Sequence, residues 1–360
     1  TFINAWKVAD LRKKMLFTAL IVLIFRIGAA IPVPFTNISG DNGIIDPTGE
    51  TFMNYLSMMT GEAFAYGTIF ALSITPYINS SIIIQLLGVV IPALEKLSKE
   101  GEEGRKKIAK ITRYVTIALG FLQSTAYFIY LNAKDYVLYQ GTSKAIEVFQ
   151  ALVIIFVLSA GTALVMWLGE QINDKGIGNG ISIILFAGII SRIPTEASML
   201  FSTNPQVGSY FSRGGIYYFL APFVVVCYIL MIAYIVWMDN AERKIPVQYA
   251  KRVVGRKMYG GQSTHIPIKV NMSGVMPIIF ASSILSLPPT IELFVANKLS
   301  DDSFWHTFFG WFSPTSVVYG VLYFLMIIFF AYFYAAIQYN PVEMANNIRK
   351  NSGMIPGIRP

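Results

Sequence analysis

The chain offers few side chains that could carry out acid–base, nucleophilic or metal chemistry. It contains two histidines, His265 and His306, and a single cysteine, Cys227, which cannot form a disulfide within the chain. The HExxH, GxSxG and CxxC patterns, which would place zinc ligands, a nucleophilic serine or a redox dithiol, are absent from the sequence. We therefore expect a protein that is not an enzyme, with no catalytic residues, no cofactor and no metal site.

A glycine-rich stretch at residues 176–180, which reads GIGNG, comes nearest to a phosphate-binding loop. Its spacing does not match GxGxxG, no GK[ST] follows it, and no strand precedes it. A tight turn that leads into a helix explains the stretch better, because glycine permits the backbone angles that such a turn needs.

The most distinctive chemical feature is a basic segment between Asp239 and Asn271. Its seven cationic side chains stand against two acidic ones, Asp239 and Glu242, for a net charge of +5. Moving so many cations across a bilayer is costly, so we expect the segment to stay in the cytosol and to offer a basic docking surface beside the membrane. The cationic residues are Arg243, Lys244, Lys251, Arg252, Arg256, Lys257 and Lys269.

The elements that must position this segment are membrane helices. Of the 360 residues, 54% are hydrophobic and 13% are charged, and the mean hydropathy is +0.55, which is far too apolar for a soluble domain of this size. The apolar runs are about 17 to 25 residues long and lack the alternation of a transmembrane barrel, so we predict an all-α polytopic membrane protein. Eight spans are expected, near residues 15–33, 67–91, 112–132, 147–169, 180–194, 216–238, 272–294 and 315–338.

The distribution of basic residues predicts the orientation of these spans. Of the 28 Lys and Arg residues, 22 lie on the side of the N-terminus and the basic segment, five lie on the other side, and Arg26 lies inside the first span. Both termini of the chain are therefore expected in the cytosol. No small-residue cleavage site follows the first apolar run, so we expect that run to remain as a span. Arg26 either snorkels to the membrane surface or pairs with a neighbouring helix.

A long non-cytosolic segment, residues 34–66, follows the first span. It contains an apolar stretch that is long enough for a short helix but too short to cross the membrane. Two interpretations stay open: the stretch plugs an opening, or it is an amphipathic segment that lies on the outer leaflet. The apolar residues concerned are Phe52, Met53, Leu56, Met58 and Met59.

The second span is unusually polar for a helix that faces lipid. Polar groups in hydrocarbon need hydrogen-bond partners or water, so this helix should face other helices or an aqueous path. Hydrogen bonding between helices accounts well for Ser80 and Ser81 but less well for Asn79 and Gln85. Pro76 is expected to loosen the backbone ladder within the span.

Several stretches of the sequence together resemble the SecY family, the central subunit of the bacterial protein-translocation channel. They are VADLRKK and IPVP around the first span, ITPYINSSIIIQLL in the second, GEQINDKGIGNGISI before the fifth, YAKR, QSTHIPIKVN and GVMPIIFASSI around the seventh, and NSGMIPGIRP in the tail. The resemblance implies a clamshell of two inverted-repeat halves around an hourglass pore, here residues 1–194 (spans one to five) and 195–360 (spans six to eight, the basic segment and the tail, residues 340–360). The family has ten spans, so the second half is incomplete in this sequence.

The resemblance also implies roles for particular residues. A ring of apolar side chains at the pore waist would consist of Ile74, Ile78, Leu185, Ile189 and Ile279, where Ile74/Ile78 and Leu185/Ile189 each share a helix face. A movable plug would be formed by Phe52, Met53, Leu56, Met58 and Met59, within residues 51–64. A lateral gate between helices two, three, seven and eight would include Asn79, Ser80, Gln123, Ser283 and Leu287. A docking surface for a motor or ribosome would include Arg243, Lys244, Lys251, Arg252, Arg256, Lys257 and Arg359.

By this resemblance the protein is a passive protein-conducting channel in the bacterial cytoplasmic membrane, for secretion across the membrane and insertion into it. Its expected partners are the small membrane subunits SecE and SecG, the SecA ATPase motor, the ribosome, signal peptides, translocating polypeptides and membrane lipids. Two alternatives stay open. One is a secondary transporter whose helices are interrupted at Pro76 and Pro277, although no span carries a carboxylate near mid-depth. The other is a membrane scaffold that recruits partners through its basic segments.

Overall fold

The computed structural model places the chain in two compact units. The first comprises Thr1–Ala197 and Ser283–Val321, and the second comprises Ser198–Ser282 and Leu322–Pro360. The structure describes residues 6–38, 57, 60–138, 144–201, 215, 217–249, 252–254, 257–259, 263–289, 291, 304–313, 316–338, 345–346 and 353–354.

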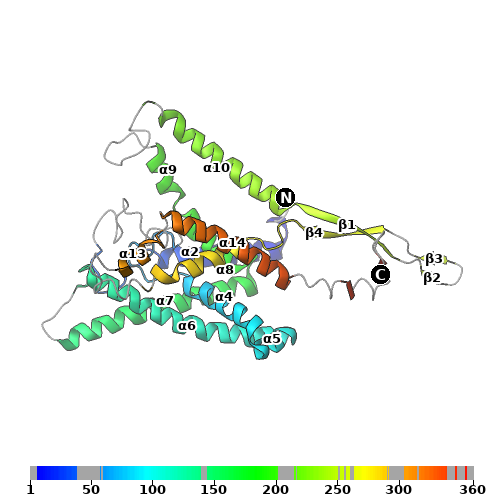
Figure 1. The fold of residues 1–360 in the computed structure, drawn as a ribbon. Coiled ribbons are helices and arrows are strands. Elements are labelled where there is room, and N and C mark those ends of the chain that lie inside the picture. The colour runs from blue at the N-terminus through cyan, green and yellow to red at the C-terminus, as the bar shows by residue number, and fades with distance from the viewer. Residues whose placement is uncertain are drawn as a thin grey trace. The chain divides into compact units, whose positions relative to one another are not determined.

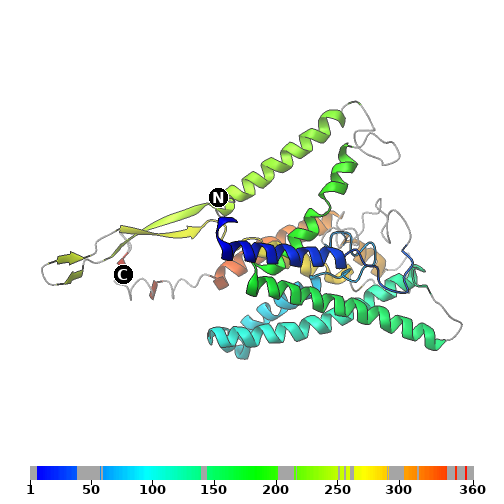
Figure 2. The ribbon, with the colours of Figure 1, turned by 180° about the vertical axis from the view of Figure 1, so that it is seen from behind.

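The first unit is a layer of helices (Figures 1 and 2). Four of its helices are long or central to the packing: α2 (Ala9–Gly28), α4 (Thr75–Val90), α6 (Glu102–Ala133) and α7 (Lys144–Lys175). The shorter helix α5 (Pro92–Lys99) lies between α4 and α6 in the sequence, and α8 (Gly180–Ile190) follows α7. The next helix, α9 (Ile193–Phe201), crosses the boundary with the second unit. A further short helix, α13 (Phe304–Gly310), lies in the segment Ser283–Val321, which belongs to the first unit.

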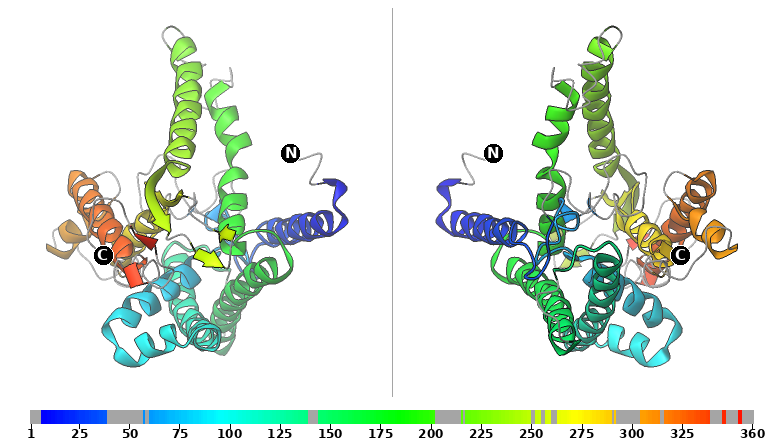
Figure 3. Two further views of the ribbon diagram at one scale, coloured as in Figure 1. Left: turned by 90° about the vertical axis from the view of Figure 1, so that its right-hand side faces the viewer. Right: turned by 90° about the vertical axis from the view of Figure 1, so that its left-hand side faces the viewer.

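Each of the eight predicted spans contains a helix, but fewer helices meet the length and composition needed to cross a membrane. Within the described residues, four do so: Glu102–Ala133, Lys144–Lys175, Tyr218–Asp239 and Val317–Ala336. A fifth would be α4 and α5 taken together, which are bent by 106° at Ile91 (Figure 3). The helix α2 carries several cations among its apolar residues, and α8 and α11 (Met276–Leu285) are short.

Both prolines that were expected to interrupt membrane helices lie instead at helix starts. The helix α4 begins at Thr75, with Pro76 in its first turn, and residues 61–74 form turns rather than the first part of a span. In the same way α11 begins at Met276, so that Pro277 lies in its first turn. Proline is tolerated there because the first-turn N–H groups have no partner within the helix. The expected loosening at Pro76 was therefore wrong, and the transporter hypothesis loses its interrupted helices.

The helices α6 and α7 lie side by side and meet through small and hydroxyl-bearing residues. Thr116 and Ser124 of α6 are fully buried, and each hydroxyl donates to the carbonyl oxygen four residues earlier at 2.7 Å. Across the interface the Ser159 hydroxyl donates to Oγ of Ser124 at 3.0 Å. Hydroxyls that are satisfied in this way let two apolar helices approach closely without leaving polar groups unpaired.

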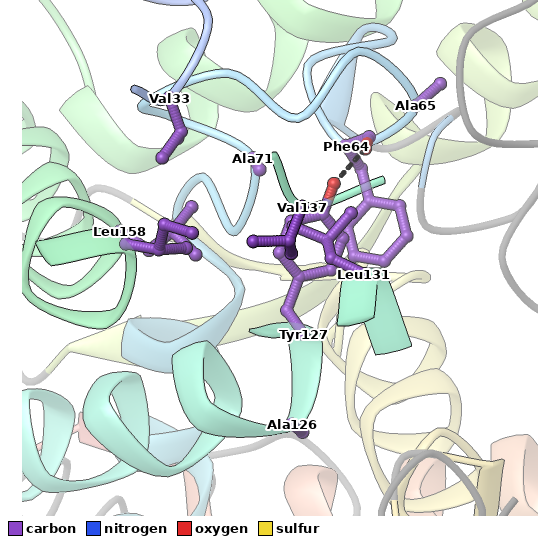
Figure 4. Packing of buried hydrophobic residues seen from close by; sticks show 10 residues of the cluster. Val33, Phe64, Ala65, Ala71, Ala126, Tyr127, Leu131, Val137 and Leu158 are labelled. Atoms are coloured by element: carbon purple, nitrogen blue, oxygen red, sulfur yellow. Dashed lines mark hydrogen bonds between the residues drawn. The ribbon is translucent and has the colours of Figure 1, made fainter. Parts of the chain in front are cut away.

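Two groups of buried apolar side chains form the core of the first unit. One joins α6, α7 and the turns before α4, and its residues Phe64, Tyr127, Leu131 and Leu158 are shown in Figure 4. The other joins α2, α7 and α8 through Phe25, Val165, Ile184 and their neighbours. In it the rings of Phe25 and Phe70 stack at a centroid distance of 5.8 Å. The turns before α4 therefore contribute to both cores.

The basic segment of the second unit is a β-hairpin rather than an irregular loop. It follows α10 (Tyr217–Asp239) and consists of β1 (Glu242–Tyr249) and β4 (Ser263–Lys269), which pair antiparallel from Glu242↔Lys269 to Gln248↔Ser263. Near its tip β2 (Arg252–Val254) pairs with β3 (Lys257–Tyr259). The tail strand β5 (Gly353–Met354) pairs with β1 and gives the sheet the order β4-β1-β5 (Figure 1). In the same unit the Phe280 ring of α11 meets Phe330 of α14 (Val317–Gln338) edge to face.

The register of the hairpin separates its side chains onto two faces. Residues opposite each other in an antiparallel pair share a face, so Lys244 and Pro267 lie on one face while Ile245 and Ile266 lie on the other. Val247, on the same face as Ile245, is completely buried. The face of Lys244 also carries Glu242 and Lys269, whereas the face of Ile245 and Val247 also carries the exposed Arg243, so cationic side chains project from both faces of the hairpin.

Candidate functional site

A small cavity with a mixed, largely apolar lining lies in the first unit, where the turns before α4 meet α4, α6 and the residue that follows α11. Its volume is about 30 Å³, which is room for roughly two water molecules. The polar residues that line it are Thr60, Thr75, Asn79, Gln123 and Ser286, and the apolar ones are Phe64, Ala71, Leu72, Ala126 and Tyr127.

Asn79 is the key polar group of this cavity. It lies in the second turn of α4 with 6% of its surface exposed, and its Oδ1 atom has no hydrogen-bond partner among the described residues. A buried amide oxygen without a partner costs about 1–3 kcal/mol. The polar residues of the lining and the volume both fit a bridging water or an incoming polar group, which would remove this cost.

A short hydrogen bond joins Tyr127 and Phe64, two further residues of the cavity lining. The phenol of Tyr127, on α6, donates to the carbonyl oxygen of Phe64 at 2.6 Å, and both side chains are buried (Figure 4). The two rings lie 4.6 Å apart between centroids. Close by, the Thr60 hydroxyl accepts from the Phe64 N–H at 3.2 Å. The turns before α4 are therefore attached to α6 by both polar and apolar contacts.

The structure brings together only part of the predicted lateral gate. Asn79 and Gln123 line the cavity, whereas Ser80, Ser283 and Leu287 are not among the residues that line it. The Ser80 hydroxyl, fully buried, donates to the carbonyl oxygen of Pro76 at 2.7 Å. Ser286 lines the cavity but was missed from the sequence. Its position three residues after Ser283, on the same helical repeat, was the signal that could have pointed to it.

The predicted ring residues occupy different environments. Ile74 is 1% exposed and packs in the core between α2, α7 and α8, while Ile78 and Leu185 are partly buried against that core. Ile189 is 51% exposed at the end of α8. Ile279 is half-buried on α11, in the second unit. The i, i+4 relation of Ile74 and Ile78 is seen directly, because the Ile78 N–H donates to the Ile74 carbonyl oxygen. Their role as a ring stays a prediction.

The predicted plug and docking residues are only partly within the described chain. Phe52, Met53, Leu56, Met58 and Met59 lie outside it, as do Lys251, Arg256 and Arg359. Arg243 and Lys244 are exposed on β1. The backbones of Arg252 and Lys257 belong to β2 and β3. Strand β5 of the tail pairs with Gln248 and Tyr249 of the basic hairpin, and this strand pairing was not predicted, although the resemblance had assigned Arg359 of the tail to the same docking surface.

The groups that the described residues gather are suited to binding. Among them no three His, Cys, Asp or Glu side chains lie close enough to hold a metal ion. The groups that the fold does gather are neutral amides and hydroxyls around the cavity and guanidinium or ammonium groups on the hairpin. Such groups can form hydrogen bonds and attract anions.

Comparison with known proteins gives a consistent result. The SecY family model matches residues 68–360. A protein translocase subunit SecY of Mycobacterium tuberculosis is 43% identical over 373 residues, covering 100% of this chain and 81% of the relative. The corresponding Streptomyces coelicolor protein is 42% identical over 366 residues, covering 99% and 81%.

Solved structures show the same fold at low sequence identity. One, described as "The structure of a protein conducting channel", matches with a TM-score of 0.61 at 16% identity and covers 98% of this chain and 79% of that one. Another, described by its plug domain that stabilises the closed state of the SecY translocation channel, has a TM-score of 0.65 at 18% identity, with the same coverage. The family model spans most of the chain and the curated relatives match its whole length, so the chain belongs to the SecY family.

Proposed function

We propose that this protein is the membrane-embedded channel through which unfolded polypeptides cross the bacterial cytoplasmic membrane or enter it sideways. The observation that carries the proposal is the 43% identity to protein translocase subunits over the entire chain. The apolar helices agree with a membrane location. A channel of this kind is passive, so its motion and its driving force come from partners.

The cavity is the part of the structure that best supports a lateral gate. Its walls come from the turns before α4, from α4 and α6 and from Ser286, segments that are distant in the sequence. The unpartnered Oδ1 of Asn79 offers a ready acceptor for water or for the backbone of an incoming signal peptide. We assign Asn79, Gln123 and Ser286 to this gate, together with the predicted Ser80, Ser283 and Leu287.

The apolar ring is proposed to seal the closed channel. Branched aliphatic side chains resist ions because a narrow apolar constriction expels water, yet they can part around a polypeptide. The ring comprises Ile74, Ile78, Leu185, Ile189 and Ile279, with the plug formed within residues 51–64. Of the five residues, Ile74 has the least structural support for a place in the ring, because its side chain is buried in the core of the first unit.

The hairpin and the tail are proposed as one cytosolic docking surface, with the N-terminus on the same side. Strand β5 pairs with β1, so residues near Arg359 are tied to the strand that carries Arg243 and Lys244. Arginine suits such a surface because its planar fork binds carboxylates or phosphates with two hydrogen bonds. The expected occupants are the SecA motor and the ribosome, and SecE and SecG are expected to complete the channel within lipid.

The channel proposal is tested by substituting Ile78 and Ile279 with asparagine. In the full-length channel reconstituted with its partner subunits in planar bilayers, the double variant should show higher resting ion conductance and should accept substrates with weak signal sequences. The polar asparagine side chains let water enter the constriction, and a water-filled constriction no longer excludes ions. The matched control is Ile232→Asn on α10, an exposed aliphatic position. Unchanged conductance and unchanged signal stringency in the double variant would rule out the ring assignment.

The docking proposal has a separate test. The triple substitution of Arg252, Arg256 and Arg359 by glutamate should weaken binding of the motor and slow translocation while leaving membrane insertion of the channel intact, because it reverses the charge of the surface. A matched charge reversal on α6, at Lys106 and Lys110, separates this surface from general positive charge. Normal motor binding by the triple variant would move the docking surface elsewhere.

A further inference from the structure

The first unit contains a cluster of charges that the proposed gate, ring and docking surface do not use. It lies where the C-terminal ends of α2 and α8 meet the entry segment, defined as residue 57 and residues 60–74. The members are Arg26 in the last turn of α2, Arg192 just after α8, and Glu62 of the entry segment. One guanidinium group pairs with the Glu62 carboxylate, and the other lies beside the neighbouring Gly61.

The carboxylate is held by one of the two arginines. Nε of Arg192 lies 3.6 Å from Oε1 of Glu62, and the side chains are 19% and 29% exposed. This burial lies between that of surface pairs, which contribute little, and that of buried pairs, whose disruption is strongly destabilising. The ion pair joins the end of α8 to the entry segment.

The second arginine lies on the other side of the same turn. A Cβ placed on Gly61 would be 3.1 Å from Nη1 of Arg26, 2.8 Å from Oγ of Ser191 and 2.6 Å from the Gly188 carbonyl oxygen. The backbone of the turn therefore touches both helix ends. Nη1 of Arg26 is buried and has no hydrogen-bond partner among the described residues. The Arg26 guanidinium therefore lies against the backbone of the residue that precedes Glu62.

The turn itself is conformationally unusual. Gly61 and Glu62 both have left-handed backbone angles, with φ of +64° and +71°. Glycine adopts this region freely, but for glutamate it is uncommon and costs energy unless the surroundings compensate. The Glu62 N–H donates to the Ser57 carbonyl oxygen at 2.9 Å, and the Tyr66 N–H donates to the Glu62 carbonyl oxygen at 3.1 Å. Charge pairing and these hydrogen bonds are what hold a strained turn in place.

We propose that Glu62, Arg192 and Arg26 form a charge clasp that fastens the entry segment to α2 and α8 in the resting protein. Opening separates Glu62 from Arg192 and lets the strained turn relax. The clasp then sets how readily the segment moves, because it adds a barrier that must be overcome before the turns leave the helix ends. This inference rests on the proposed channel function for its role in gating, but the fastening itself is a property of the structure.

The fastening is tested by hydrogen–deuterium exchange on the full-length channel held with its partner subunits in lipid nanodiscs. Glu62→Gln and Arg192→Gln should each speed exchange of the amides of Glu62, Phe64 and Tyr66 by about tenfold, because each breaks the partly buried ion pair that joins the end of α8 to the entry segment. The double variant should exchange no faster than the single ones, since the two residues share one interaction. The charge swap Glu62→Arg with Arg192→Glu should recover part of the protection.

The matched control removes an ion pair of the same chemistry in an exposed place. Glu102 and Lys106 of α6 form a pair at 3.2 Å with side chains 85% and 75% exposed, and Glu102→Gln should leave the entry segment unchanged. Exchange in Glu62→Gln within twofold of the unsubstituted protein would overturn the clasp, and so would equal effects of Glu62→Gln and Glu102→Gln.

A measurement of resting ion conductance tests whether the clasp affects gating. Together with the exchange data it distinguishes failure of the clasp from failure of the proposed channel function. If the protein is a channel and the clasp sets its opening, Glu62→Gln should raise resting conductance severalfold and the charge swap should lower it again. If exchange rises but the unsubstituted protein neither conducts nor translocates, the clasp stands and the channel function fails. If translocation is normal but exchange and conductance do not change in Glu62→Gln, the channel function stands and the clasp fails.

Discussion

Two apolar helices, α7 and α10, both meet the length and composition needed to cross a membrane, yet the protein packs them in opposite ways. In the most apolar 18-residue window of each helix, 44% of α7 is buried inside the protein but only 6% of α10. Ile154 and Leu158 of α7 are fully buried, whereas Phe219 of α10 is 83% exposed. Hydrophobicity all round a helix is thus compatible with either environment.

The difference lies in what each helix offers to a neighbour. The helix α7 presents Ser159 and Thr162 to α6 and Gly161 to the turns before α4, whereas α10 exposes bulky Phe, Tyr, Leu and Trp side chains along its length. In lipid there is no hydrophobic gain when two apolar helices meet, so close packing and hydrogen bonds decide which helices associate. The α6–α7 region is therefore held by close packing and hydrogen bonds, whereas the side chains of α10 are mostly exposed.

The largest effect that would sharpen this comparison is expected at Gly161. A Cβ at this position would lie 2.1 Å from the carbonyl oxygen of Ile69, which is backbone and cannot simply rotate away. Gly161→Ala should cost about 3 kcal/mol of unfolding free energy, because the turns before α4 must shift. Denaturant titration of the purified protein in detergent measures this.

The control is Gly320→Ala on α14, where a Cβ would meet nothing within 4 Å. This substitution should be neutral or stabilise the protein by up to about 1 kcal/mol through helix propensity. Equal losses at Gly161 and Gly320 would contradict the distinction between a packed and an exposed helix.

A smaller effect is expected from the hydroxyl of Tyr127. Tyr127→Phe removes the 2.6 Å hydrogen bond to the Phe64 carbonyl oxygen and leaves that buried oxygen without this donor. We expect a loss of about 1–3 kcal/mol in unfolding free energy. Tyr228→Phe on α10, where the side chain is 57% exposed, should change stability by less than about 0.5 kcal/mol. A neutral Tyr127→Phe would mean that the turns before α4 are held by apolar packing alone.

A third effect concerns the ion pair that joins α6 to α7. Nε of Arg113 donates to Oε1 of Glu170 at 2.6 Å, with side chains 51% and 23% exposed. A double-mutant cycle with Arg113→Gln and Glu170→Gln should give a coupling of about 0.5–1 kcal/mol, since solvent screens a pair that is half exposed. The same cycle on Lys106 and Glu102 should give less. If the coupling between Lys106 and Glu102 were larger than that between Arg113 and Glu170, the ion pair between α6 and α7 would add nothing specific to their contact.

The smallest effect should be confined to the hairpin, which is held by backbone pairing. Met354→Pro removes an N–H from β5, which pairs Met354 with Gln248 and Gly353 with Tyr249. Amide exchange at Gln248 and Tyr249 should become faster, while Ile245 and Ile266 in the centre of the hairpin keep their protection. Global stability should not change measurably. Loss of protection throughout β1 would show that the tail strand supports the whole hairpin.

Several features of the fold and site could be predicted because they depend on residues close together in the sequence. Apolar runs placed a helix in all eight expected segments, and the polar residues of the second span correctly indicated that Asn79 does not face lipid, since it is buried beside a cavity. The resemblance of short stretches identified the family, which the match over residues 68–360 confirms. The ring, plug and docking roles stay predictions.

Other features depended on contacts between distant residues, and the sequence pattern was silent or misleading there. The helix α4 begins at Thr75 rather than near residue 67, because the preceding turns pair with the chain after α2: the Val33 N–H donates to the Gly67 carbonyl oxygen and the Ile69 N–H to that of Ile31. The basic segment became a hairpin with the tail strand added to it. Ser286 follows Ser283 by three residues, but only its position in the folded chain shows that it lines the cavity.

By itself the sequence determined that the chain is a helical membrane protein with a basic segment of net charge +5, because hydrophobic length and charge act locally and can be counted along the chain. Only the tertiary structure decided which of the equally apolar helices are buried, and which charges meet. The physical reason is that Gly161 packing on Ile69, Tyr127 bonding to Phe64, and Arg192 pairing with Glu62 each join residues more than 60 positions apart in the sequence. Such contacts depend on shape and backbone position, which no local pattern of hydrophobicity encodes.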